Sequence, residues 1–243
     1  QASPLPLSAY FNDKVTHIFR EQYFSPRPAV PTLQLPVQGI GNWCYPLTSA
    51  VIDDSGLRAR AGKENVYRLP DGLRFYTPSD TARNNIVFTS LWDNYPDSVT
   101  IPLQGRASYA YFLLAGTTNP MQSQLVNGQI IIRYTDGSHS ALMLKNPETW
   151  WPIEQDYFED GYAFHLKQPA PLRVRLKTGE AYRPPLTEEK YTSIKGYSNR
   201  GVEGGAATVL SLPLDPSRQL HSLVIKTCAR EVVIGLMGLS LQL

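Results

Sequence analysis

The chain alternates short apolar and β-branched runs with clusters of Gly, Pro, Asn and Asp, and helical periodicity is scarce. This pattern predicts strands that are separated by turns. Strands are expected at 86–92, 98–103, 109–115, 129–134, 139–145, 162–166, 172–176, 208–214, 219–227 and 231–241. So many strands without intervening helices favour an all-β protein, an antiparallel β-sandwich, over a parallel sheet with crossover helices.

Local sequence is most informative at two places. The run Tyr109–Ala115 is almost continuously apolar, which predicts a strand buried on both faces. The turn Thr135–Ser138 contains Asp136-Gly137, which supplies the positive φ angles of a tight hairpin between the strands on either side. A short helix is also expected near Asp13–Tyr23.

The chain is expected to form one sandwich domain over residues 1–243. Residues 86–243 would supply its core, and residues 1–85 an N-terminal extension and the first strands. The proline-rich opening and the segment 177–207, with Pro184-Pro185 and Gly204-Gly205, do not fit a strand pattern. Long segments of this kind usually cover a neighbouring surface or carry function, so both are expected to be decorating loops.

Composition narrows the classes of partner. The formal charge is +2, and Lys and Arg are scattered, which argues against a nucleic-acid partner. No apolar run approaches the roughly 20 residues that span a bilayer, so no membrane partner is expected. Cys44 and Cys228, the only cysteines, are either bonded to each other or two buried thiols.

The segment 146–157 (NPETWWPIEQDY) is the most unusual part of the chain, because it combines aromatic rings with carboxylates. Sugars pack their flat C–H faces on aromatic rings and offer hydroxyls to polar groups, so the segment suits a saccharide. Neighbours in an extended chain point to opposite faces. At least one indole is therefore expected to meet a ligand, a long loop or a partner domain, unless the chain bends or a second layer covers it. The candidate ligand-binding residues here are Trp150, Trp151, Glu154, Asp156 and Tyr157.

Trp92 and Asn94 form a weaker version of the same mixture, on a turn between two expected strands. Loops at one end of a sandwich can converge, so these two residues are candidates for the same binding site. Ordinary turn chemistry is the alternative explanation for Asn94.

Catalysis by carboxylates is the second hypothesis. On one strand, Glu154 and Asp156 would share a face about 6.6 Å apart along the chain, which a glycoside hydrolase can use for general acid and base. No nucleophile motif is present, and the four histidines lack metal-ligand spacing. No cofactor is expected, although a structural calcium ion could use acidic pairs near turns. These are Asp53 with Asp54, Asp93 with Asp97, and Asp156 with Asp160.

The segments SLWDNYP, VTIPLQGRASYAYFLLAGTTNPMQ, YTDG and NPETWWPIEQDY, with the ending LPLDPSRQLHSLVIKTCAREVVIGLMGLSL, resemble a known type of module. They are similar to the galactose-binding-like jelly-roll modules of large secreted glycoside hydrolases from saccharolytic bacteria. The resemblance implies a jelly roll, a secreted or periplasmic location and an adjacent catalytic domain as partner. It transfers no catalytic residue.

The leading hypothesis is a non-catalytic carbohydrate-binding or supporting module of a polysaccharide-processing protein. The alternatives are a glycan-active enzyme that uses Glu154 and Asp156, and a purely structural module between domains.

Overall fold

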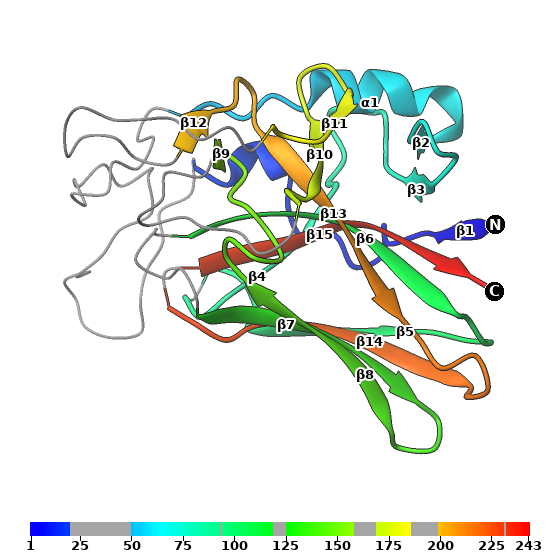
Figure 1. Ribbon diagram of the computed structural model, residues 1–243. Coiled ribbons are helices and arrows are strands. Elements are labelled where there is room, and N and C mark those ends of the chain that lie inside the picture. The colour runs from blue at the N-terminus through cyan, green and yellow to red at the C-terminus, as the bar shows by residue number, and fades with distance from the viewer. Residues whose placement is uncertain (20–49, 93, 119–124, 158–168, 186–198, 231) are drawn as a thin grey trace.

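The computed structural model describes residues 1–19, 50–92, 94–118, 125–157, 169–185, 199–230 and 232–243. Two curved antiparallel sheets face each other in this part of the chain (Figure 1), which confirms the expected all-β sandwich. The expected strand at 162–166 and the residues Asp93, Asp160 and Cys44 lie outside the described ranges.

In the larger sheet, the N-terminal strand pairs with the C-terminal strand. Its strands follow the order β1 (Ala2–Leu5), β15 (Val232–Gln242), β6 (Tyr109–Thr118), β13 (Ala206–Pro213), β10 (Leu172–Arg175) and β11 (Ala181–Tyr182), and β4 (Val87–Ser90) also pairs with β15. The smaller sheet has the order β5 (Ser98–Pro102), β14 (Leu220–Thr227), β7 (Val126–Tyr134) and β8 (His139–Lys145). Two short pairs complete the strands: β2 (Val66–Arg68) with β3 (Arg74–Tyr76), and β9 (Gln155–Tyr157) with β12 (Asn199–Gly201).

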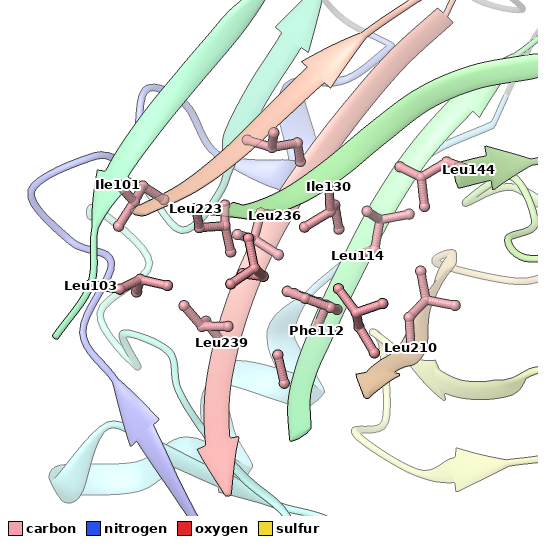
Figure 2. Packing of buried hydrophobic residues seen from close by; sticks show 14 of the residues in the cluster. Ile101, Leu103, Phe112, Leu114, Ile130, Leu144, Leu210, Leu223, Leu236 and Leu239 are labelled. Carbon is pink, nitrogen blue, oxygen red and sulfur yellow. The ribbon is translucent and has the colours of Figure 1, made fainter. Parts of the chain in front are cut away.

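From Phe112 to Thr118, both faces of strand β6 are covered. Its alternate residues Phe112 and Leu114 point into the core between the sheets, where they meet residues such as Leu223 and Leu236 (Figure 2). The intervening Leu113 and Ala115 belong to a second core on the outer side of the larger sheet. The predicted burial on both faces is therefore confirmed for residues 112–115, whereas Tyr109 is exposed and Tyr111 half-buried at the start of the strand.

The second core lies under a third layer, which the sequence pattern did not predict. This layer consists of the N-terminal segment, α1 (Ser55–Ala61) and the β2–β3 pair. Its apolar side chains, Val15, Ile18, Leu57, Tyr67 and Phe75, are buried against the larger sheet.

Of the local predictions, the hairpin is confirmed, but the helix and the long loop are wrong. The hairpin is confirmed: β7 and β8 pair across Asp136-Gly137, and Gly137 has a φ of 88°. The helix expected near 13–23 is wrong over its described part, which forms only a 3₁₀ turn at Val15–His17. The segment 177–207 is not a continuous loop, because it contains β11, β12 and the start of β13.

Gly116 on β6 marks a close approach between strands. A Cβ atom there would lie 2.4 Å from the backbone oxygen of Val233 and 3.3 Å from Cζ3 of Trp150. Because β15 is fixed by pairing along its length, the carbonyl group has little room to move away.

We expect Gly116→Ala to lower the free energy of unfolding by about 2–3 kcal/mol, since the added methyl group overpacks the strand junction. Urea denaturation measures this change. Thr100→Ala, at an exposed position on β5, is the control and should change stability by less than about 0.5 kcal/mol. Equal small effects of the two substitutions would show that the junction tolerates a side chain.

Candidate functional site

The segment 146–157 does not project from the sandwich. It leaves β8 and runs between the neighbouring strands β6 and β13, to which its backbone is bonded. The amide of Ile153 donates to the Gly116 oxygen at 2.7 Å, and the amide of Ala206 donates to the Ile153 oxygen at 2.8 Å. The segment is thus fixed to the larger sheet.

The two indoles point into different clusters, as expected for neighbours, but both are buried. Trp150 has 0% of its surface exposed and lies in the core between the sheets, where its Nε1 donates to Oδ1 of Asn127 at 3.0 Å. Trp151 has 1% exposed, and its Nε1 donates to the Pro147 oxygen at 2.8 Å.

A second layer covers Trp151. The ring of Tyr157 meets it edge-on at a centroid distance of 5.2 Å, and Ala170 packs in the same small cluster. Tyr157 is itself buried and accepts a hydrogen bond from Nδ2 of Asn146 at 3.1 Å. The expectation that ring surface of Trp150, Trp151 or Tyr157 is free for a sugar is therefore wrong, because the fold uses these rings as packing.

Arg173 on β10 organises this region, and the sequence pattern did not reveal it. The residue is fully buried, and its guanidinium carbon lies 5.8 Å from the centroid of the Trp151 ring. Its five N–H groups find acceptors at 2.8–3.1 Å, namely Oδ1 of Asp156, the backbone oxygens of Trp151, Pro152 and Gln155, and Oγ1 of Thr208.

Asp156 is the anionic partner of this cation. Its Oδ1 lies 3.1 Å from Nε of Arg173, and the hydroxyl of Tyr182 donates to the carboxylate at 2.8 and 3.0 Å. The carboxylate is thus occupied by structural partners. These contacts are a sufficient reason for an aspartate at position 156, and a catalytic role is not needed to explain it.

Glu154 has the titration property of a general acid but not the access. Burial raises the pKa of its carboxyl to about 7, and the Thr117 hydroxyl, which lies 3.1 and 3.2 Å from the two oxygens, and Arg173 oppose this rise. A raised pKa beside an ionised carboxylate is typical of acid–base sites. However, only 2% of the residue is exposed, and Glu154 does not line the clefts at Tyr111 or at Tyr76, so a substrate has no path to the carboxyl in this structure.

The region around residue 92 does not add to the same site. Trp92 is buried in the outer core, in a different cluster from Trp150 and Trp151, and Asn94 is half-buried. The predicted convergence of these aromatic residues on one binding surface is wrong, because each ring fills a separate part of the interior.

Metal ligands are not assembled among the described residues, where no three His, Cys, Asp or Glu side chains come close enough to hold an ion. Asp54 is committed to Arg58 at 2.9 Å, and hydrogen bonds from Ser55 hold the pKa of Asp53 below its usual value. Cys228 is an exposed free thiol.

An open aromatic surface lies elsewhere, on the outer face of β6. Tyr109 and Tyr111 are two residues apart, so they share a face, and their rings stack at a centroid distance of 6.1 Å and an angle of 21°. Tyr109 is 40% exposed. In the sequence, the Tyr-x-Tyr spacing predicts that both rings lie on one face of the strand. The apolar residues around the two tyrosines, however, favour the interpretation of the whole run as core.

Two clefts meet beside Tyr111. The larger has a volume of about 360 Å³, and its polar lining includes Glu148, Arg183 and Ser211. The smaller, of about 190 Å³, is lined by Gln1 and Gln242 among others. Tyr111, Leu73 and Asp71 line both, so the clefts adjoin along these residues.

Comparisons with protein-family models, with curated proteins and with solved structures found no match to this chain. Among the described residues, no helix is long and apolar enough to cross a membrane.

We expect Glu154→Gln to stabilise the protein more at pH 8 than at pH 5. The folded-state pKa lies above the value of 4.5 for an unperturbed carboxyl, so the unfolded state loses its proton first. Ionisation therefore costs folding free energy progressively from about pH 4.5 to 7, by up to about 3 kcal/mol. Urea denaturation at the two pH values measures the difference.

Thr117→Val is the companion variant. It removes the hydroxyl that stabilises the ionised form, so it should lose more stability at pH 8 than at pH 5. If the stability change caused by each variant is the same at pH 5 as at pH 8, the pKa of the Glu154 carboxyl is not raised as described.

Proposed function

We propose that this chain is a non-catalytic carbohydrate-binding module of a secreted or periplasmic polysaccharide-processing protein, with the galactose-binding-like form of the jelly roll. The proposal places the sugar on the Tyr109–Tyr111 surface rather than on the segment 146–157. It is supported by the antiparallel sandwich and by the resemblance of the strand motifs.

The observation that carries the proposal is the pair of stacked tyrosine rings, of which Tyr109 is 40% exposed and Tyr111 is half-buried and lines both clefts. Rings that lie nearly parallel along one strand offer a flat apolar platform to successive sugar residues. The hydroxyl of Tyr111 donates to Oε1 of Gln242 at 3.0 Å, which fixes the orientation of its ring before a ligand arrives. A platform fixed in advance loses less conformational entropy on binding.

Polar groups beside the platform suit the hydroxyls of a sugar. The adjoining clefts present carboxylates from Asp71 and Glu148, the guanidinium of Arg183 and the side-chain amide of Gln242. Binding sites for small molecules combine apolar walls with a few such donors and acceptors. Both charge signs are present, which favours a neutral glycan over a strongly charged one.

A supporting role beside a catalytic domain is the second candidate, and the outer face of the smaller sheet favours it. Val224, Ile131 and Ala141 are register partners on β14, β7 and β8, and they form an apolar row across that face, in which Val224 is buried and the other two are half-buried. Met143, on the same side of β8, is 42% exposed. Apolar surface of this kind is typical of contacts with another domain.

Isothermal titration calorimetry with neutral hexasaccharides of glucose, xylose, mannose and galactose tests the proposed function. We expect one of these probes to bind, and Tyr109→Ala or Tyr111→Ala to weaken binding at the platform at least tenfold, because burying an apolar side chain of this size contributes about 1.5–3 kcal/mol. Met143→Ala, at a position of similar exposure on the other sheet, is the matched control and should bind as the unmodified chain does.

Circular dichroism would establish that the variants fold. An affinity and a stoichiometry that both tyrosine substitutions leave unchanged would refute the platform as a sugar site. Absence of binding for all four hexasaccharides would favour the supporting role.

A further inference from the structure

A third cleft, larger than the two beside Tyr111, has a separate set of lining residues. Its volume is about 500 Å³, and it is formed by the N-terminal segment, including Pro4 and Phe11, and by the end of β3, including Tyr76 and Thr77. Volumes of this size are typical of sites that enclose small organic ligands.

One polar group in the cleft lining has no hydrogen-bond partner within the described part of the chain. Thr77 is buried, and its hydroxyl has no hydrogen-bond partner among the residues that the structure describes, although its backbone amide donates to the Asn65 oxygen at 2.9 Å. Buried hydroxyls are nearly always hydrogen-bonded, so an unpaired one next to a cleft indicates a place for a ligand group. A ligand hydroxyl can both donate to it and accept from it.

The wall of the cleft is held rigidly from behind. Arg58 on α1 is buried, forms an ion pair with Asp54 at 2.9 Å, and donates to three backbone oxygens of the segment 78–83. Pro78 and Arg83, at the two ends of this segment, line the cleft. The cleft is thus shaped before any ligand binds, which favours affinity.

The lining matches one class of ligand. Tyr76 is 38% exposed and, with Phe11, supplies aromatic surface, while Glu64 and Arg83 add one charge of each sign. Balanced charge, aromatic surface and an unpaired hydroxyl suit a neutral molecule that has both C–H faces and hydroxyl groups.

We infer that this cleft is a second saccharide-binding site on the chain. The class of ligand rests on the proposed function, but the site itself rests on separate residues. Gln1 and Ala2 line the small cleft beside Tyr111, whereas Pro4 lines the large one, so both sites border strand β1. One polysaccharide chain that reaches both sites would be bound with avidity.

Calorimetry with the hexasaccharide that binds, and affinity electrophoresis with the polysaccharide of the same sugar, test this inference. We expect two hexasaccharides per chain. Tyr76→Ala and Thr77→Val should each remove one of them and leave the other unchanged. Each should also lower the affinity for the polysaccharide at least tenfold, because bivalent binding is lost.

Tyr111→Ala is the matched variant, since it removes the other site. One bound hexasaccharide that is lost in Tyr111→Ala and unaffected by Tyr76→Ala or Thr77→Val would overturn the second site and leave the proposed function standing. Binding that persists in Tyr111→Ala and is lost in Tyr76→Ala would support this cleft and refute the tyrosine platform.

Two further outcomes would overturn the inference. One is absence of saccharide binding by the unmodified chain, which would refute both sites. The other is a decaproline probe that binds in a Tyr76-dependent manner while no sugar does, because the cleft would then be a peptide site.

Discussion

Arg173 is a cation enclosed in the interior, and each of its N–H groups needs an acceptor there. The acceptors come mostly from one short stretch, between Trp151 and Asp156, and from Thr208 on the neighbouring strand. Satisfying the guanidinium therefore fixes the path of that stretch across the larger sheet. It also fixes which rings are covered.

This constraint accounts for the difference between the chemistry of the segment 146–157 and its role. A sequence rich in Trp, Tyr and carboxylates looks like a recognition loop. In the folded chain, Trp151 lies beside the guanidinium, Asp156 neutralises it, and Glu154 is sealed close enough for the cation to affect its pKa. The proposed saccharide sites therefore lie on surface that the layers leave open, at Tyr109 and Tyr111 and in the cleft beside Thr77.

Sequence reasoning succeeded where the determining contacts were local. The Asp136-Gly137 turn and the apolar run of β6 carry their own signals, because turn geometry and burial on two faces act on adjacent residues. It failed where distant segments meet. Strand β1 pairs with β15, and the layer that contains Leu57 and Phe75 packs on the outer face of the larger sheet. Neither contact has a local signature. Arg173 in Leu-Arg-Val-Arg also looks like an ordinary exposed strand position, since only the covering segment buries it.

The most direct test of this account is the stability of Arg173→Lys together with the access of acrylamide to tryptophan fluorescence. Lysine keeps the charge but cannot serve the five acceptors, so we expect a loss of about 3 kcal/mol in the free energy of unfolding and stronger quenching as Trp151 becomes accessible. Arg175→Lys, two residues along the same strand and stacked 4.0 Å over the Tyr182 ring, should cost less than about 1 kcal/mol and leave quenching unchanged. If the two variants behave alike, the buried guanidinium does not hold this region together and the account is wrong.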